Sequence, residues 1–409
     1  METRSMPSLR HLRVFLMVAE LQSVRKAADA VFLSQPAVTQ AIAKVEAQIG
    51  AVLFERRSSG TYLSEAGTIL ASRAASMFRQ IHEALAGLGL TEDLVDSVSQ
   101  RITRSQIRGL IAAAGGTSFA EAAEALHLSQ VSLYRSARDL ERTLGRTLFY
   151  NSVSGIVPAP AGMELACRLS TAMREVEWAM EEIRAAEGKQ DGELRVGAMP
   201  LAGSFVLGPV IHELTRLCPG AHVNMRTGSC SALARALQIG EIDFVVGLIR
   251  NTVDPAEIEQ EALFSSPYVI VGRPGHPLSK KAKITPADLE AFDWIAPSNG
   301  SVRRAALDRL LASMKRPPVA NIEAYSISTI RLLMSESDRL TIMTKFEFEC
   351  ERAGGALAML PYDRIEPAHT TGVAWRAGWT PTPLHLKFLK LLRAQGAKIA
   401  SSDALVQAA

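Results

Sequence analysis

The sequence predicts a multidomain protein in which two consecutive α-rich domains, each containing a β-hairpin, precede a two-lobed α/β domain. Three observations support this prediction. A block of residues near the N-terminus recurs 95 residues further along without a gap. Both copies of the block place apolar residues at helical spacing and then in two short strands. After residue 192 the pattern changes to strands that alternate with helices, which is typical of parallel βαβ units.

The composition of the chain is that of a protein with packed domains. Of its 409 residues, 47% are hydrophobic and 21% are charged, and the net charge of +3 is too small to indicate nucleic-acid binding by itself. The four cysteines are scattered and form no Cys-x-x-Cys pair, so we expect no disulfide framework, no metal site and no cofactor. The N-terminus has no apolar signal region, and no apolar run approaches the roughly 18 residues of a membrane span. We therefore expect a cytoplasmic protein without membrane contact.

The repeat aligns residues 27–68 with residues 122–163, and 14 of these 42 positions are identical. The identical positions include Leu33-Ser34-Gln35 on Leu128-Ser129-Gln130 and Leu53-Phe54 on Leu148-Phe149. An agreement of this extent indicates a duplicated domain. We expect the first copy to form a domain over residues 1–90 and the second a domain over residues 91–187.

The pattern in each copy predicts three helices and a hairpin, and the first copy shows the signals most clearly. It predicts helices over 9–19, 24–31 and 34–48, strands over 52–54 and 61–63 with a polar turn over 56–60 between them, and a long helix over 65–88. Ser23 and Ser34 suit helix N-caps, Pro36 suits a first helical turn, and Gly50 suits a helix end. Three helices with short connections followed by a β-hairpin make up the winged helix-turn-helix plan.

In this plan the third helix lies in the major groove of DNA. Its first two turns carry amide and hydroxyl groups that can read base edges, and nearby cations can contact phosphates. We expect the DNA contacts of the first copy to come from Ser34, Gln35, Pro36, Thr39, Gln40, Lys44, Arg56 and Arg57.

The first copy resembles the N-terminal signature of the LysR family of bacterial regulators. The likeness rests on Ala27-Ala28, Leu33-Ser34-Gln35-Pro36-Ala37-Val38-Thr39-Gln40, Val45-Glu46, Ile49-Gly50, Leu53-Phe54-Glu55-Arg56 and Leu63-Ser64-Glu65-Ala66-Gly67. The resemblance implies a transcriptional regulator that binds double-stranded DNA as a homo-oligomer, a dimer or a tetramer, with helix 65–88 as a linker helix for dimerisation. Because this chain has two such helices, 65–88 and 164–187, we hypothesise that the two copies pair within a chain or in a mixed arrangement.

The second copy differs at positions that matter for DNA readout. Pro36, Thr39 and Gln40 correspond to Val131, Tyr134 and Arg135, and both hairpin arginines are replaced. Two interpretations stay open: a second DNA reader, or a degenerate copy that only pairs with the first. Residues 1–90 have 10 basic and 7 acidic residues, a net +3, and residues 91–187 have 10 and 13, a net −3. We expect both copies to contact DNA, the first more strongly, and the contacts of the second to be Ser129, Gln130, Ser132, Tyr134, Arg135 and Arg138.

The C-terminal half follows a polar hinge over 187–192 and predicts a domain over 193–405. Strands are expected over 193–199, 222–225, 243–248, 268–272, 294–296, 321–325, 340–343 and 373–375, and helices over 204–217, 231–239, 302–314, 327–335 and 383–395. We expect lobe 1 to comprise 193–267 and 368–405 and lobe 2 to comprise 268–367, with a ligand cleft at the strand ends. This half resembles the effector domain of LysR regulators, itself similar to type 2 periplasmic binding proteins, in the runs 192–197, 240–247 and 274–278.

The cleft is expected to lie just past the strand ends. Its expected lining is Leu201, Ser229, Ser231, Leu248, Ser298, Ser301, Ser326 and Thr344. Hydroxyl and backbone N–H groups at helix N-termini suit an anion, so we expect a small organic acid, a sugar acid or an intermediate of aromatic metabolism as the effector. Arg226, Arg303 and Arg304 are further candidate sources of positive charge.

Three other classes of protein compete with this interpretation. An enzyme is opposed by the absence of His-Glu-x-x-His, Gly-x-Ser-x-Gly and Walker A motifs. A solute-binding protein is opposed by the missing signal sequence and by the repeat. An effector-independent DNA-binding protein, whose second winged unit serves only for oligomerisation, stays open; a ligand that stabilises the C-terminal domain against heat separates it from a regulator.

Overall fold

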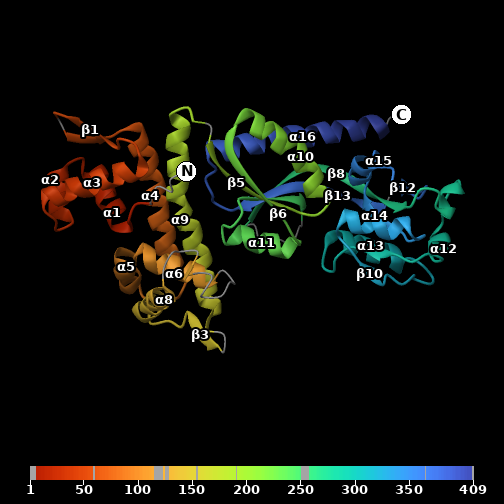
Figure 1. Ribbon diagram of the computed structural model, residues 1–409, viewed down its shortest axis with the longest axis horizontal. Coiled ribbons are helices and arrows are strands. Elements are labelled where there is room, and N and C mark those ends of the chain that lie inside the picture. Colours follow the sequence, from red (N-terminus) through yellow and green to blue (C-terminus); the bar gives the residue numbers. More distant parts are fainter. Residues whose placement is uncertain are drawn as a thin grey trace. The chain divides into compact units, whose positions relative to one another are not determined.

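The computed structural model describes residues 6–58, 60–114, 123–124, 129–152, 155–189, 191–249, 258–363 and 365–407. The chain divides into two compact units, Met1–Lys189 and Gln190–Ala409, called unit 1 and unit 2 below (Figure 1). Unit 1 is mainly helical, whereas unit 2 is built on a sheet that helices cover. None of the described helices is long and apolar enough to cross a membrane.

Unit 1 begins with three helices and a hairpin. These are α1 (Leu9–Leu21), α2 (Val24–Ala30), α3 (Gln35–Ile49), β1 (Phe54–Arg57), β2 (Gly60–Leu63) and the long helix α4 (Glu65–Ala86). Ser23 and Ser34 each accept a backbone N–H in the first turn of the following helix, which satisfies a donor that has no partner within the helix. α3 ends at Gly50, whose φ of 84° suits glycine and few other residues.

The first strand of the hairpin begins later than the sequence pattern predicts. β1 starts at Phe54, not at residue 52, so Arg56 and Arg57 lie in the strand and not in the turn. The reason is that the preceding backbone is used elsewhere: the Leu53 N–H donates to the Glu46 carboxylate at 2.8 Å, and the Val52 carbonyl accepts the Ser64 hydroxyl at 2.7 Å.

The rest of unit 1 contains matching elements 95 residues further along. α6 (Arg104–Ala114), α8 (Gln130–Leu144), β3 (Phe149–Ser152), β4 (Gly155–Pro158) and α9 (Pro160–Ala186) start where α1, α3, β1, β2 and α4 start after a shift of 95. Residues 115–122 and 125–128, where a counterpart of α2 is expected, lie outside the described residues. α5 (Glu92–Arg101), which the sequence pattern did not indicate, connects the two parts.

Two contacts recur at equivalent positions of the repeat. The Glu46 carboxylate accepts the Leu53 N–H at 2.8 Å, and the Glu141 carboxylate accepts the Leu148 N–H at 2.9 Å. A Cβ on Gly67 would lie 2.1 Å from the Leu53 carbonyl oxygen, and one on Gly162 would lie 2.2 Å from that of Leu148. In both places a glutamate and a glycine hold the start of the hairpin between two helices.

The helices α4 and α9 lie side by side and share a core (Figure 1). Met77 and Ile81 of α4 and Leu169 and Val176 of α9 are buried in one continuous apolar cluster that extends through unit 1. The resemblance implied two linker helices, and pairing of the two copies within a chain or in a mixed arrangement was hypothesised from the sequence; in the structure α4 packs on α9 of the same chain.

The core of unit 2 is a mixed sheet with the strand order β11-β8-β13-β7-β5-β6, and β12 pairs with β8. The strands are β5 (Asp191–Ala198), β6 (Gly220–Thr227), β7 (Phe244–Leu248), β8 (Ile258–Gly272), β11 (Thr341–Thr344), β12 (Ala358–Met359) and β13 (Ile365–Arg376). β5 is parallel to β6 and β7, whereas β13 is antiparallel to β7 and β8. β8 and β13 run through both lobes, because one end of β8 pairs with β13 beside β7 and its other end pairs with β11.

The expected strand 268–272 is only the last third of β8. The earlier part was missed because Glu259 and Glu261 interrupt the apolar pattern; Glu261 pairs with Arg393 of the helix 383–407 at 2.6 Å. The spacing of apolar residues in a sequence is thus a weaker signal for a strand whose side chains form ion pairs.

Helices cover the two lobes of unit 2 around separate cores. They are α10 (Ala202–Leu217), α11 (Cys230–Gln238) and α16 (Pro383–Gln407) in lobe 1, and α12 (Pro286–Leu289), α13 (Val302–Ala312), α14 (Ile327–Ser335) and α15 (Lys345–Arg352) in lobe 2. Lobe 2 also has a short parallel pair, β9 (Ile295–Ala296) and β10 (Ile322–Glu323). Phe244 and Phe388 lie in the core of lobe 1, and Tyr268 and Trp294 lie in a core of lobe 2.

Candidate DNA-binding surface and ligand cavity

The helix α3 has one buried face and one polar face. Val38, Ala41, Ile42 and Val45 are buried, which fixes how the helix is turned. The exposed residues include Gln35, Pro36, Thr39, Gln40 and Lys44, and Ser34 caps the helix by accepting the Ala37 N–H. Amide, hydroxyl and ammonium groups in a row form a surface that can contact base edges and phosphates.

Positive charge gathers near this face. Burial lowers the pKa of His11, and the nearby cations Lys44 and Arg10 lower it further. On the hairpin, the Arg57 guanidinium lies 2.9 Å from the exposed Glu55 carboxylate and above the Tyr62 ring. The side chain of Arg56 lies outside the described residues. An exposed ion pair of this kind is worth little, so Arg57 can exchange its partner for a phosphate.

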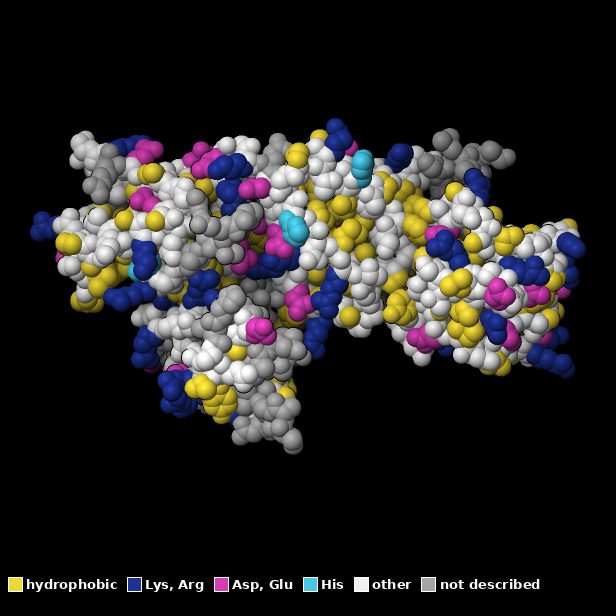
Figure 2. All heavy atoms as spheres, in the orientation of Figure 1, with side chains coloured by type: hydrophobic (Ala, Val, Ile, Leu, Met, Phe, Trp, Pro, Cys, Tyr) yellow, Lys and Arg dark blue, Asp and Glu magenta, His cyan; other side chains and the backbone are white. Residues whose placement is uncertain are grey.

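The corresponding face of α8 has a different chemistry. Gln130, Ser132, Tyr134 and Arg135 are exposed, and Ser129 caps the helix by accepting the Ser132 N–H at 3.1 Å. Figure 2 shows basic side chains beside apolar ones over this end of unit 1.

Three arginines of this region already have intramolecular partners. Arg138 pairs with Glu141 and lies against the Tyr134 ring, and hydrogen bonds to these two groups raise the pKa of Arg138. Arg142 pairs with Asp139, and Arg146 donates to the Gly89 carbonyl at 2.9 Å. Part of the positive charge of α8 is therefore already neutralised by carboxylates of the same helix.

A cavity of about 490 Å³ lies between the two lobes of unit 2. Six of the eight expected residues line it, namely Leu201, Ser229, Ser231, Leu248, Ser298 and Ser301. The other two cap helices: the Ser326 hydroxyl accepts the Thr329 N–H at 3.5 Å, and the buried Thr344 hydroxyl accepts the Glu347 N–H at 3.3 Å. The sequence analysis missed lining residues such as Pro200, Cys230, Asn299 and Tyr325, each of which directly adjoins an expected position in the sequence.

Helix N-termini from both lobes border the cavity. The Ser229 hydroxyl accepts the Ala232 N–H at the start of α11, and the Ser301 hydroxyl accepts the Arg304 N–H at the start of α13. Leu201 precedes α10 with a φ of 66°, a conformation that costs about 1–3 kcal/mol for a residue with a side chain. Strain of this kind persists where the surrounding structure holds the backbone in place, as at a ligand site.

The three arginines expected as sources of positive charge are paired with carboxylates, and only one of them, Arg303, lines the cavity. Arg303 lines the cavity and hydrogen bonds to Glu347, which is fully buried. Arg226 pairs with Glu241 at 2.5 Å, and Arg304 pairs with Asp308 at 2.8 Å. The described side chains therefore leave the cavity close to electrical neutrality.

Two aromatic rings, one from each lobe, adjoin Arg303. Tyr268 and His369 stack with their ring centroids 5.5 Å apart. Burial raises the pKa of Tyr268, whereas burial together with the charges of Arg303 and Arg309 lowers the pKa of His369. Both groups are thus held in their neutral forms near pH 7.

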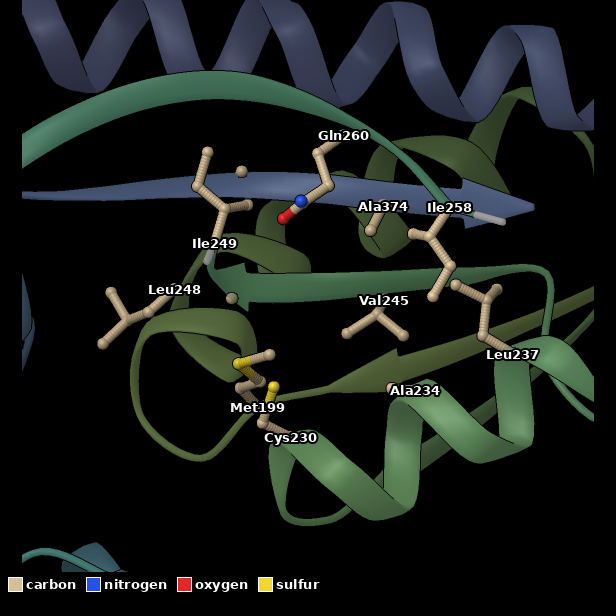
Figure 3. A pocket seen from close by; sticks show the side chains of 12 residues that line it. Met199, Cys230, Ala234, Leu237, Val245, Leu248, Ile249, Ile258, Gln260 and Ala374 are labelled. Atoms are coloured by element: carbon tan, nitrogen blue, oxygen red, sulfur yellow. The ribbon is translucent and has the colours of Figure 1, made fainter. Parts of the chain in front are cut away.

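A smaller cavity of about 40 Å³ lies in lobe 1, and Figure 3 shows it from close by. Its lining is mostly apolar and includes Ala234, Leu237, Val245, Ile258 and Ala374. Met199, Cys230 and Leu248 line this cavity and the larger one. The larger cavity therefore shares apolar lining with this pocket of lobe 1, and its serine hydroxyls come from both lobes, Ser229 and Ser231 in lobe 1 and Ser298 and Ser301 in lobe 2.

Comparison with known families identifies the class of protein. Residues 187–397 match the LysR substrate binding domain, and residues 9–68 and 105–163 each match the bacterial regulatory helix-turn-helix protein of the lysR family. The chain belongs to the LysR family of transcriptional regulators. It is a DNA-binding regulator with a substrate-binding domain and not an enzyme; DNA, a small-molecule effector and further copies of the chain are its partners.

Individual relatives match over different lengths. The HTH-type transcriptional regulator GalR of Pseudomonas putida is 28% identical over 391 residues, which is 95% of this chain and 97% of that protein. The SDS degradation transcriptional activation protein of a Pseudomonas species is 30% identical over 285 residues, 68% of this chain and 91% of that protein. Full-length OxyR of Pseudomonas aeruginosa has a similar fold, with a TM-score of 0.54 at 23% identity over 71% of this chain and 93% of that one.

Proposed function

We propose that this regulator carries two winged helix-turn-helix domains, over 1–90 and 91–187, and contacts DNA with both. The first domain contributes most of the binding. The third domain, over 193–405, responds to a small organic acid, sugar acid or aromatic-pathway intermediate in the 490 Å³ cavity. Because chromosomal DNA is the partner, the proposal places the protein in the bacterial cytoplasm.

The duplication is supported by contacts as well as by residue identities. The third helix and both hairpin strands of the second domain start 95 residues after those of the first. The carboxylates of Glu46 and Glu141 make the same hydrogen bond, and Gly67 and Gly162 make the same close approach to the hairpin. These contacts belong to the scaffold that orients the third helix, so the second domain has the framework of a DNA reader.

The unequal contributions follow from the charges on the two faces. Lys44 on α3 is exposed, whereas Arg138 and Arg142 on α8 pair with Glu141 and Asp139. A cation that must give up an internal carboxylate to reach a phosphate contributes less net binding energy. Arg135 is exposed on α8 and is the strongest candidate for a DNA contact of the second domain.

The effector class is carried by one observation: serine hydroxyls and helix N-termini face the cavity, while its arginine is neutralised. Helix N-termini favour an anion through their backbone N–H groups. Since Arg303 is paired with Glu347, we favour a ligand with a single carboxylate. The volume is within the range of roughly 300–1,000 Å³ that small-ligand sites span.

A DNase footprint of the intact protein with Gln35→Ala and with Arg135→Ala tests the DNA part. We expect Gln35→Ala to weaken protection over the whole site and Arg135→Ala to weaken it over one part only. Lys189→Ala, an exposed cation beyond α9, is the matched control and should leave the footprint unchanged. If Arg135→Ala also has no effect, the second domain is not a reader.

Thermal unfolding with a panel of organic acids tests the effector part. A ligand at 100 times its Kd stabilises unit 2 by about 2.7 kcal/mol. Ser301→Ala should reduce the response, because it removes a hydroxyl at the cavity. A panel that gives no shift would favour the effector-independent alternative.

A further inference from the structure

The helices α4 and α9 run antiparallel within one chain. Arg73, in the first half of α4, contacts Glu182, near the end of α9. Gln80 contacts Glu175 in the middle of both helices, with 2.7 Å between the amide nitrogen and a carboxylate oxygen. Towards the end of α4, a Cβ on Gly87 would lie 3.8 Å from the Arg168 guanidinium carbon. Along these three contacts the residue number rises in α4 and falls in α9, as it must for antiparallel helices.

A buried ionic network lies in the middle of this helix pair. Arg73 is only 4% exposed and Glu175 only 3%. The Arg73 guanidinium donates to the Glu175 carboxylate at 2.9 Å and to that of Glu182, and it lies above the Trp178 ring. Burial acts to lower the pKa of Arg73, but the hydrogen bonds to the two glutamates outweigh it and raise the pKa. A buried arginine in this position depends on both carboxylates.

Only α9 supplies those carboxylates. With the shift of 95 residues, the positions of Glu175 and Glu182 correspond to Gln80 and Gly87 on α4. A second copy of α4 in the same antiparallel geometry would therefore face Arg73 with an amide and a glycine. Glu83 occupies the position of Trp178, but it is exposed on α4 and pairs with Arg79 of its own helix. Arg73 of α4 therefore finds its two carboxylates on α9, and a second copy of α4 would not supply them.

The connection between the two domains is short and packed onto both. Val95 and Val98 of α5 are buried in the core that α4 and α9 share. Arg13 of α1 donates to the Ser99 carbonyl, and Arg104 of α6 donates to the Met6 carbonyl at 2.7 Å. The Arg13 contact holds α5 against the first domain, and the Arg104 contact joins the second domain to the first. Pairing within one chain keeps these contacts, whereas pairing between chains would require each chain to make them with its partner.

We propose that α4 and α9 form a closed pair within each chain, so that one chain carries its two winged domains already assembled. Copies of the chain then join through surfaces other than these helices. The inference rests on the proposed function only because it treats both domains as winged helix-turn-helix domains. The pairing of the two helices does not depend on DNA binding. Each chain offers two different third helices, so the footprint of one chain is asymmetric.

Chemical cross-linking of the intact regulator tests this pairing. In a chain whose four native cysteines are replaced by serine, Gly87→Cys and Arg168→Cys are joined by a short bismaleimide; neither residue belongs to the buried network. We expect the double variant to link within one chain and keep the mobility of a monomer on a denaturing gel. The matched control co-expresses the two single variants, and we expect no dimer band. A dimer band of similar yield in that control would overturn the proposal.

A second variant keeps the test decisive if the cysteine-free chain fails to fold. Arg73→Met with Glu175→Gln and Glu182→Gln removes the network without leaving a buried charge. We expect sedimentation to give the same oligomeric state as the unchanged protein, because copies join elsewhere. Dissociation to monomers would overturn the proposal. Neither result depends on Arg135→Ala, so failure of this inference and failure of the DNA proposal are distinguishable.

Discussion

Replacing Glu347 by glutamine probes the ion pair that neutralises the arginine of the ligand cavity. The Glu347 side chain is fully buried and that of Arg303 is 10% exposed. Glutamine keeps an oxygen that can accept the Thr344 N–H, which the carboxylate now accepts at 2.8 Å. The substitution therefore removes the negative charge and places the amide NH2, a donor, where the other carboxylate oxygen accepts from Arg303, so that Arg303 is left buried without a counter-charge.

The expected loss is large for a single substitution. Leaving one member of a buried ion pair uncompensated costs about 3–5 kcal/mol. In a unit of this size, 1 kcal/mol corresponds to about 2–4 °C in Tm, so the transition of unit 2 should fall by roughly 6–20 °C. The same argument predicts a comparable loss for Arg303→Met, which leaves the Glu347 charge buried.

Differential scanning calorimetry of the four members of the cycle measures the effect. The double variant Arg303→Met with Glu347→Gln should recover most of the loss, because a neutral pair of similar volume carries no buried charge. Glu347→Gln should also tighten binding of a carboxylate ligand, since Arg303 becomes an uncompensated cation at the cavity. Falls in Tm below 2 °C for both single variants would refute the reasoning.

Two further predictions concern the scaffold. Gly67→Ala and Gly162→Ala should each destabilise unit 1 by about 1–3 kcal/mol or more, because the added Cβ meets a carbonyl oxygen at 2.1 and 2.2 Å. Gly208→Ala in α10, where the Cβ meets nothing within 4 Å, is the control in urea unfolding and should cost nothing. His369 has a pKa below its unfolded value of 6.5, so its neutral form contributes stability that is present above about pH 6.5 and lost as the pH falls through the lower folded value. His369→Gln should flatten the fall in Tm of unit 2 below pH 6.5; an unchanged pH profile would contradict this assignment.

The elements of unit 1 were predictable because their signals are local. A serine hydroxyl and a glycine mark the two ends of α3, and the same residue types recur at the ends of α8. The exposed face of α3 then follows from the helical period, which places Val38, Ala41 and Val45 on the opposite side. The start of the hairpin was misplaced because it depends on Glu46, a side chain outside the strand itself.

The candidate cavity was predictable in position and not in charge. Residues after the strand ends were expected at the cleft, since strand termini of neighbouring βαβ units meet at one edge. The sequence pattern also indicated Arg303 as a possible source of positive charge. Its pairing with Glu347, which is 44 residues away, removes that charge, and no periodicity relates the two positions.

The sequence by itself determined that the chain contains a repeat, where the third helix of each copy lies, and where the α/β half begins. These conclusions depend on helix caps, apolar spacing and residue identities, all of which act within a few residues along the chain. The tertiary structure alone decided that α4 packs on α9 and that Arg73 finds its counter-charges on Glu175 and Glu182. The physical reason is distance along the chain: those partners are 102 and 109 residues from Arg73, and only the folded core brings them together.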